Sequence, residues 1–468
     1  MAADTAFTQA LEIVLAREVD GYRALADCRQ LTAGASQETY RIQCETDDGD
    51  TSFALRRAVP TLQNTTSEVG SISLATEALL FQLAAENAIP APRVLYVLSE
   101  ADGMGDGFLM EWLEGETLGQ RIVKVDELTE VRPRLARQCG EILGRIHAID
   151  WQAAGLSEHV PTVSPETLVD ETYAAYRELD VPAPMIDYAW RWQKDNLPTD
   201  YRTTLVHGDF RNGNLMVNAD GVNAVLDWEL AQIGDPVRDL GWLCVNSWRF
   251  GVSDKPVGGF GDVHELLAGY ASTSGVEVDP QAILFWQVFG SFWWAMATLQ
   301  MANSWRRGET PSLERPVIGR RSSEDQMDCV NLLIPGSFAL PDADRPLDAG
   351  TQLPMPAELL SGVRDFLKET VDGQLDPHNG FLARVAANSL AIAQREFVHG
   401  TTLAAAEKSR LEALLDQSGD LDALRWELAT RLRDGLALDT PDLADHLRQT
   451  VAAQCWIDQP RYSALAGG

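Results

Sequence analysis

Two short segments constrain the fold of this chain more than any other feature of its sequence. The first, residues 205–214, reads Leu-Val-His-Gly-Asp-Phe-Arg-Asn-Gly-Asn and places Asn214 five residues after Asp209. The second, residues 225–229, reads Val-Leu-Asp-Trp-Glu, and its Asp227 closes an apolar run that predicts a short strand. The fold that joins these segments is expected to bring two carboxylates and one amide together.

Side chains of these types suit the transfer of a phosphoryl group from ATP. Such a reaction needs a carboxylate that orients or deprotonates the attacking hydroxyl, and oxygen ligands that hold Mg²⁺ against the triphosphate. Asp209 suits the first role, and Asn214 with Asp227 suits the second, because Mg²⁺ takes few protein ligands. The alternative is that these residues only cap turns, as Asp and Asn often do.

The two segments resemble the aminoglycoside phosphotransferase and choline kinase group, distant relatives of protein kinases. The catalytic loop of that group reads H-G-D-x-x-x-x-N, and its metal aspartate stands in an I/V-x-D-[FW]-E strand. The resemblance implies that Asp209 is the catalytic base and that Asn214 and Asp227 bind Mg²⁺. It also implies that His207 and Asp239 support the catalytic loop without touching the substrate.

The resemblance extends to a nucleotide site in the first part of the chain. Residues 31–42 are similar to the family's G-x-S-x-x-T-Y loop, whose small residues let backbone N–H groups approach phosphates. Arg56 stands where kinases carry a lysine, and strand alternation favours it over Arg57 for this position. The nucleotide-binding residues implied are Gly34, Ser36, Thr39, Arg56 with its partner Glu77, and Glu111 and Leu113 in the hinge. An ordinary turn and a surface ion pair are the alternatives.

The patterning predicts an α+β chain, and the resemblance implies that it has a bilobal, protein kinase-like fold. Helical spacing at residues 7–20 and 73–87 and four short strands indicate a small sheet-based N-lobe. The strands expected there are 40–45, 52–56, 94–99 and 107–112. The pattern then becomes mainly helical, as in 132–149, with short strands at 204–207, 215–217 and 225–227. The domains expected are an N-lobe at 1–114, a C-lobe at 115–334, a linker at 335–356 and a helical domain at 357–460.

The C-terminal domain is predicted to be all-helical. Its expected helices are 357–370, 380–398, 403–417, 420–434 and 440–454. This tail resembles an uncharacterised domain that accompanies such kinases in bacteria, and its role stays open.

The acceptor of the phosphate is constrained only by a closer resemblance. Residues 227–231, 234–236 and 239–251 resemble the kinase-like portion that precedes acyl-CoA dehydrogenase modules in some large animal enzymes. This implies a hydroxyacyl-CoA as acceptor, with Trp248, Arg249 and Phe250 as substrate residues. The alternative is that the aromatic residues belong to the core and Arg249 snorkels at the surface. An aminoglycoside or another small alcohol is the second candidate acceptor, and a nucleotide-binding pseudokinase scaffold is the alternative of another class.

Composition narrows the partners and the compartment. The net charge of −31 disfavours nucleic acid and anionic lipid as partners. Six dispersed cysteines and an N-terminus without a signal-peptide pattern favour the cytoplasm. Residues 282–305 are long and apolar enough to span a bilayer, but three amide side chains among them favour a buried core helix. The expected partner is therefore a small-molecule alcohol, with no nucleic acid and no membrane, and the oligomeric state stays open.

Overall fold

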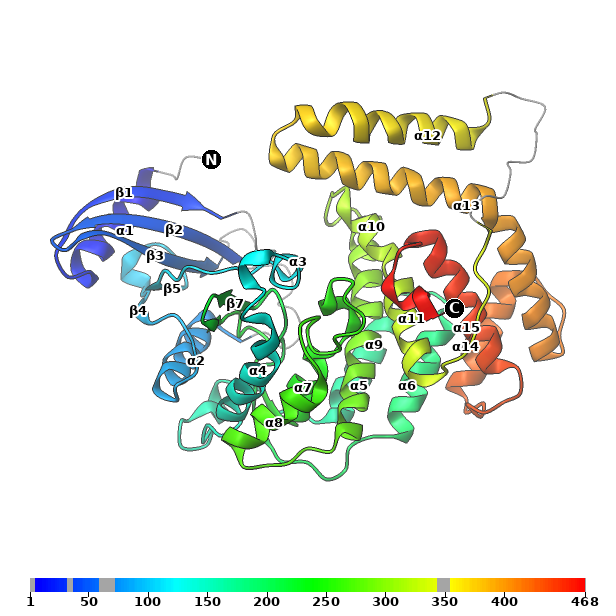
Figure 1. Cartoon of the computed structure of the whole chain (residues 1–468), viewed down its shortest axis with the longest axis horizontal. Helices are drawn as coiled ribbons and strands as arrows, with labels where there is room; N and C mark the ends of the chain where they lie inside the picture. The colour runs from blue at the N-terminus through cyan, green and yellow to red at the C-terminus, as the bar shows by residue number, and fades with distance from the viewer. Residues whose placement is uncertain (1–4, 32–36, 59–71, 343–353, 468) are drawn as a thin grey trace. The chain divides into compact units, whose positions relative to one another are not determined.

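The structure is a computed structural model that describes residues 5–31, 37–58, 72–342 and 354–467 (Figure 1). These residues form two compact units that alternate along the chain. Unit 1 comprises Met1–Ser164, Asp200–Cys244 and Trp248–Ile283, and unit 2 comprises Pro165–Thr199, Val245–Ser247 and Leu284–Gly468. The four domain ranges expected from the sequence remain predictions.

Unit 1 begins with a five-stranded antiparallel sheet in the order β1-β2-β3-β5-β4 (Figure 1). The two predicted strand pairs are confirmed, although both strands of the first pair are longer than expected. The strand β1 was not predicted, because its polar residues do not alternate clearly with apolar ones. The elements are α1 (Thr5–Glu18), β1 (Tyr22–Gln30), β2 (Gln37–Thr46), β3 (Gly49–Ala58), α2 (Leu74–Glu86), β4 (Val94–Val97) and β5 (Gly107–Glu111).

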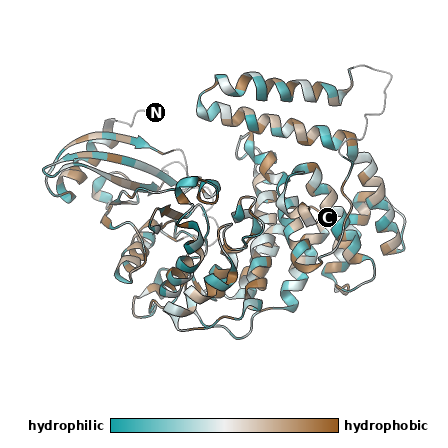
Figure 2. Ribbon diagram, viewed as in Figure 1, coloured by the Kyte–Doolittle hydropathy of each residue, from teal (hydrophilic) through white to brown (hydrophobic). Residues whose placement is uncertain are grey.

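The two faces of the sheet belong to different hydrophobic clusters. Leu55 of β3 packs in a cluster with Leu11 and Leu15 of α1. Its neighbour Ala54 belongs to the cluster that contains Phe81 of α2. Hydrophobic and hydrophilic residues are interspersed along the strands of the sheet (Figure 2), and successive side chains of one strand point to opposite faces. Arg56 therefore lies on the α2 face, two residues beyond Ala54.

The rest of unit 1 is mainly helical, with two small antiparallel strand pairs. The helices α4 and α8 pack closely at Gly140, where there is no room for a side chain. A Cβ on this residue would lie 2.0 Å from the carbonyl oxygen of Leu266. The principal elements are α3 (Gly119–Ile122), α4 (Arg132–Ile146), β6 (Thr204–Val206), β7 (Leu215–Asn218), β8 (Gly221–Val225), β9 (Gln232–Gly234), α7 (Val237–Leu243) and α8 (Val263–Ser274).

The predicted strand over 225–227 is wrong. The strand β8 ends at Val225, and Asp227 has φ +64°, a left-handed conformation that a strand does not contain. Of the apolar residues that suggested a strand, Val225 is the last residue of β8, and Leu226 is half-buried in the segment that follows. The backbone N–H of Leu226 donates to the carbonyl oxygen of Asn214 (2.8 Å). The predicted strands at 204–207 and 215–217 are confirmed as β6 and β7, and β9 was not predicted.

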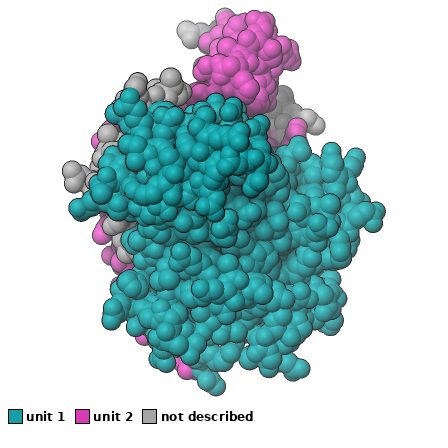
Figure 3. Space-filling view, turned by 90° about the vertical axis from the view of Figure 1, so that its left-hand side faces the viewer, with its two compact units in different colours: residues 1–164, 200–244, 248–283 teal, residues 165–199, 245–247, 284–468 magenta. Residues whose placement is uncertain are grey.

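Unit 2, coloured magenta in Figure 3, is helical. The prediction of two separate helices, 380–398 and 403–417, is wrong, because these residues belong to one 39-residue helix, α13. The sequence Gly400-Thr401-Thr402 suggested a break, but an internal glycine costs a helix only about 1 kcal/mol, which packing offsets. The elements are α5 (Pro165–Arg177), α6 (Pro184–Asp195), α9 (Pro280–Arg306), α10 (Glu314–Arg320), α11 (Ser322–Leu333), α12 (Pro356–Phe366), α13 (Pro377–Leu415), α14 (Leu421–Arg433) and α15 (Leu443–Asp458).

The helix α9 is long and apolar enough to cross a membrane by length and composition. Of its most apolar window of 18 residues, 67% is buried inside the structure. This burial is what a core helix shows, because a helix that faces lipid would keep its apolar side chains on the outside.

Candidate active site

The loop that carries the H-G-D motif follows β6 and is held by a buried carboxylate. Asp239 of α7 accepts hydrogen bonds from the backbone N–H groups of His207 (2.8 Å) and Gly208 (2.9 Å). Gly208 has φ +84°, and a Cβ there would lie 2.1 Å from the carbonyl oxygen of Leu230. A residue with a side chain therefore does not fit at this turn.

A histidine fixes Asp239 in turn. His147 Nε2 lies 3.1 Å from Asp239 Oδ2, and His147 Nδ1 lies 3.1 Å from the hydroxyl of Tyr270. Burial alone would raise the pKa of Asp239, but the hydrogen bond from His147 and the loop N–H groups outweigh it and lower that pKa. Asp239 is thus an ionised acceptor at the base of the loop.

His207 joins the loop to the segment that contains Asp227. Its Nε2 lies 3.1 Å from the carbonyl oxygen of Leu226, and its Nδ1 accepts from the backbone N–H of Asp209 (3.2 Å). Burial lowers the pKa of His207, so the ring is neutral at physiological pH. The tautomer with the proton on Nε2 makes both bonds.

Three donors surround the carboxylate of Asp209. Trp242 Nε1 and Arg211 Nε each donate to Oδ1 at 2.8 Å, and Asn214 Nδ2 donates to Oδ2 at 2.5 Å. The Asp209 side chain is 11% exposed, so these donors hold it in one orientation. Sequence reasoning named Asn214 but missed Arg211 and Trp242. Arg211 stands inside the motif itself, whereas no spacing indicates that Trp242 returns to the loop.

Arg211 also connects the loop to the segment predicted to bind substrate. Its guanidinium carbon lies 4.4 Å from the ring centroid of Trp248, a cation–π arrangement. The neighbouring Asn212 donates to the carbonyl oxygens of Trp248 (3.2 Å) and Gly258 (2.5 Å). The catalytic loop and residues 248–258 are therefore one hydrogen-bonded structure.

The three predicted substrate residues have different environments. Trp248 is buried and its ring lies 6.0 Å from that of Trp242. Arg249 is half-buried, and its Nη2 donates to the carbonyl oxygen of Cys244 (2.6 Å). Phe250 is half-buried with φ +50°, and it packs so closely on Gly119 that a Cβ there would lie 2.1 Å from its ring. Trp248 thus packs as a core aromatic would, and Arg249 is tied to the backbone.

The structure brings the two predicted metal ligands to the same end of the β7–β8 strand pair, with Asn214 just before β7 and Asp227 just after β8. Asn214 is buried, and its backbone carbonyl pairs with Leu226, the residue before Asp227. Since its Nδ2 is committed to Asp209, its Oδ1 is the side-chain atom left for a cation. The Asp227 side chain is 29% exposed, and its Oδ1 accepts from Arg56 Nη2 at 2.6 Å.

Arg56 lies at the centre of a cluster of carboxylates. Its Nε lies 3.2 Å from Glu77 Oε2, so the predicted ion pair is present. Its Nη2 lies 2.6 Å from Asp227 and 3.9 Å from Glu229. By contrast, Arg57 pairs with Glu38 on the opposite face of β3. Arg56 thus takes the position that strand alternation assigned to it.

Burial and charge act in opposite directions within this cluster. Glu77 is 1% exposed, and burial raises its pKa to about 7 although Arg56 lowers it. Burial also opposes the charge of Arg56, but three carboxylates outweigh it and raise the pKa of Arg56. The difference arises because Arg56 faces three opposite charges, whereas Glu77 faces one guanidinium and two like charges. Glu77 also accepts from the backbone N–H of Trp228 (3.3 Å).

The phosphate loop is described only in part. Gly34 and Ser36 lie outside the described residues. Thr39 is paired with Arg56 across β2 and β3. Gln37, at the start of β2, accepts a hydrogen bond from Arg56 and donates to Glu229 (3.5 Å). No sequence pattern distinguishes Gln37 from other polar residues.

The expected hinge follows the last strand of the sheet. Glu111 ends β5, where it pairs with Phe53, and its side chain is exposed. Its backbone N–H donates to the carbonyl oxygen of Arg93 (2.9 Å). Leu113 is half-buried in the segment that leaves the sheet. Both residues thus stand where the chain passes from the sheet to the helices.

Comparison with known proteins identifies the class. The sequence profile of the phosphotransferase enzyme family (APH) matches residues 27–276, more than half of the chain. The chain therefore belongs to the phosphotransferase enzyme family. A second profile, of a domain of unknown function (DUF6285), matches residues 373–462.

Two curated proteins are similar to parts of this chain. Acyl-CoA dehydrogenase family member 10 of Mus musculus is 30% identical over 229 residues, which are 46% of this chain and 20% of that protein. Acyl-CoA dehydrogenase family member 11 of Homo sapiens is 24% identical over 401 residues, 78% of this chain and 48% of that protein. The chain thus spans about half or less of the length of these curated relatives.

A solved structure shows the same fold. It comes from Ralstonia eutropha, is provisionally assigned as an aminoglycoside phosphotransferase, and is 20% identical with a TM-score of 0.55. The match covers 69% of this chain and 96% of that chain. At this identity the likeness concerns the fold alone, and it confirms the predicted kinase-like architecture.

Proposed function

We propose that this chain transfers the terminal phosphoryl group of ATP, with Mg²⁺, to a hydroxyl group of a small molecule. One observation carries the proposal. Asp209, oriented by three donors, stands in a loop that is hydrogen-bonded to the turn containing Asp227, where Arg56 and Glu77 also converge. A base, two oxygen ligands and a buried cation in one site are what phosphoryl transfer requires.

The donor set fits magnesium. Asp227 offers a partly exposed carboxylate, and Asn214 offers an amide oxygen at the same end of the β7–β8 strand pair. Hard oxygen ligands and a small number of protein contacts are what Mg²⁺ uses at phosphate sites. When bound, the metal neutralises charge on the phosphates.

In the proposed reaction Asp209 accepts the proton of the acceptor hydroxyl. The hydroxyl oxygen then forms a bond to the terminal phosphorus of ATP, and the bond from that phosphorus to its bridging oxygen breaks, which releases ADP. Trp242 and Arg211 hold Oδ1, so they fix the direction in which the carboxylate faces the hydroxyl. Arg56 lies among Glu77, Asp227 and Glu229. Its guanidinium would be the bidentate donor to the phosphates of ATP.

A hydroxyacyl-CoA is the acceptor class that we favour. Its support is the similarity to the acyl-CoA dehydrogenase family members and the link between the catalytic loop and the Trp248 segment through Arg211 and Asn212. Aminoglycosides and other small alcohols remain the second acceptor class.

One contact favours a function of another class, a nucleotide-binding pseudokinase scaffold. Asp227 Oδ1 accepts a short hydrogen bond from Arg56, and the same oxygen is a ligand in the phosphotransferase proposal. A scaffold that keeps this contact would bind nucleotide without turnover.

A transfer assay distinguishes the two functions. The full-length chain is incubated with labelled ATP, Mg²⁺ and a panel of hydroxyacyl-CoAs, aminoglycosides and simple alcohols. We expect one acceptor class to be phosphorylated and Asp209→Ala to lower kcat about 10³-fold, as removal of a general base does. Asp220→Ala, an exposed aspartate in the β7–β8 turn, is the matched control and should retain full activity. Equal trace turnover by wild type and Asp209→Ala across the panel would refute phosphotransfer and leave the scaffold.

A further inference from the structure

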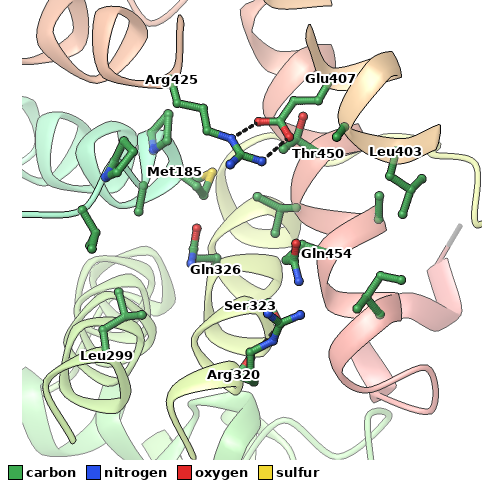
Figure 4. Close-up of a pocket in the computed structure, with 18 of the residues that line it drawn as sticks. Met185, Leu299, Arg320, Ser323, Gln326, Leu403, Glu407, Arg425, Thr450 and Gln454 are labelled. Carbon is green, nitrogen blue, oxygen red and sulfur yellow. Dashed lines mark hydrogen bonds and ion pairs between the residues drawn. The ribbon is translucent and has the colours of Figure 1, made fainter. Parts of the chain in front are cut away.

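Unit 2 contains a cavity of about 610 Å³ that is lined entirely by its own residues. The residues come from the segment before α6 and from α6, α9, α10, α11, α13, α14 and α15. Figure 4 shows Arg425 and Glu407 at one end of the cavity and Arg320 toward the other, with Gln326 and Gln454 between. This volume lies in the range of about 300–1,000 Å³ that small-molecule sites have.

The lining of the cavity is more basic than the chain as a whole. It includes four arginines and two glutamates, whereas the whole chain has a net charge of −31. Two of the arginines are paired. Arg425 makes two hydrogen bonds to Glu407 (2.7 and 2.6 Å), and Arg320 pairs with Glu396 and Asp458. The excess positive charge of the lining therefore belongs to the other two arginines, Arg306 and Arg410.

Arg410 of α13 is a half-buried cation of this lining, and Glu407 and Asp445 favour its charge without forming an ion pair with it. Among the described residues it makes no ion pair, and its Nη2 donates to the neutral hydroxyl of Thr450 (3.0 Å). Its Nε is buried and has no hydrogen-bond partner in the described structure. Burial also lowers the pKa of Arg410, which shows that the cation is poorly solvated there. A buried N–H donor without an acceptor is unfavourable, so a ligand that supplies an acceptor there would be stabilised.

His446 of α15 supplies a second unsatisfied group in the same lining. The side chain is 3% exposed, and its Nδ1 has no partner among the described residues. Burial, with Arg410 and Arg425 nearby, lowers its pKa to about 3, so the ring is neutral at physiological pH. In the tautomer that carries the proton on Nδ1, His446 offers one N–H donor without a partner, and Arg410 offers a second through its Nε.

The remainder of the lining is largely apolar. Met185, Leu299 and Leu403 line the cavity, as Figure 4 shows, together with Leu447 and Val451. Trp305 lines it as well and is 45% exposed, so it marks the opening to solvent. The lining would therefore suit a ligand that has an apolar body and one anionic group.

We propose that this cavity is a binding site for a small amphiphilic anion. Its oxyanion head group accepts hydrogen bonds from Arg410 Nε and His446 Nδ1, and its apolar body packs on Leu299, Leu403 and the other apolar side chains. The carboxylate or phosphate monoester head group supplies an ion-pair partner, which Arg410 does not have among the described residues. This inference does not rest on phosphotransfer, because it concerns unit 2 and a binding equilibrium.

Four probes with the same eight-carbon body test the proposal. Octanoate, octyl phosphate, octanol and octylammonium are titrated into the full-length chain by isothermal titration calorimetry. We expect octanoate or octyl phosphate to bind at least about tenfold more tightly than octanol, since charge-assisted hydrogen bonds contribute about 1.5–3 kcal/mol. The stronger of these two identifies the head group as carboxylate or phosphate. Binding of octanol or octylammonium as tight as that of both anions, or no binding by any probe, would overturn the proposal.

Two substitutions locate the site. Arg410→Met and His446→Leu remove the two donors and keep the approximate volume, and each should weaken binding of the better anion about tenfold. Arg384→Met is the matched control, because Arg384 is an exposed arginine of α13 that does not line the cavity. Equal loss in Arg384→Met, or no loss in Arg410→Met, would refute the assignment. The comparison of the four probes on wild type decides the proposal even where a variant fails to fold.

Discussion

The substitution Glu77→Gln is expected to stabilise the folded chain at alkaline pH while it damages the proposed nucleotide site. Burial raises the pKa of Glu77 from 4.5 to about 7, and this difference corresponds to about 3 kcal/mol of free energy. Because the pKa in the folded state is the higher one, the stabilisation is fully present below pH 4.5. It is lost as the pH rises through 7, where the buried carboxylate must ionise.

Glutamine has nearly the same shape and no charge to bury. It still accepts from the backbone N–H of Trp228, and Arg56 keeps Asp227 as an ion-pair partner. The free energy of unfolding of Glu77→Gln should therefore exceed that of wild type by about 2–3 kcal/mol at pH 8.5 and by about zero at pH 5. Little screening is expected, since Glu77 is 1% exposed.

Urea unfolding of both proteins, followed by tryptophan fluorescence and circular dichroism at several pH values, measures this difference. The matched control is Glu86→Gln, an exposed glutamate on the same helix, which should change the free energy of unfolding equally at every pH. A difference between Glu77→Gln and wild type that stays constant from pH 5 to 8.5 would refute the reasoning. It would mean that Arg56 compensates fully for the buried charge.

Three further predictions address the proposed base, the metal ligand and unit 2. Trp242→Phe removes one of the donors to Asp209 and should lower kcat about tenfold with little change in KM, measured by steady-state kinetics with the acceptor that the transfer assay identifies. Asp227→Ala should weaken binding of ATP in the presence of Mg²⁺, measured by calorimetry, and equal ATP affinity of the variant with and without Mg²⁺ is the expected result. Arg433→Met leaves the fully buried Asp187 without its cation and should lower the free energy of unfolding by about 3 kcal/mol, measured by urea denaturation; an unchanged value would contradict the prediction.

The sequence was sufficient where a function depends on local spacing. The motif at 207–214 and Asp227 could be named because their residue types and separations are read directly along the chain. The position of Arg56 was also predictable, since the two-residue period of a strand sets which face a side chain takes. The alternation along β3 that places Ala54 and Leu55 in different clusters follows from the same period.

The sequence was insufficient where a residue acts through a distant part of the chain. Trp242 is 33 residues from Asp209 and reaches it only because α7 packs beneath the loop that Asp239 holds. Gln37 joins Arg56 to Glu229 across 192 residues, and no local pattern distinguishes it from other polar residues. The continuity of α13 across Gly400 was likewise decided by packing rather than by helix propensity.

The amino-acid sequence by itself thus determined the family, the kinase-like fold, and Asp209, Asn214, Asp227, Arg56 and Glu77 of the site, because these follow from residue type, spacing and short-range periodicity. Only the tertiary structure decided how the carboxylate of Asp209 is oriented, how strongly burial acts on Glu77, and that Arg410 and His446 line one cavity. Orientation and burial depend on groups that fold back from other parts of the chain, and a linear pattern carries no information about which of them meet.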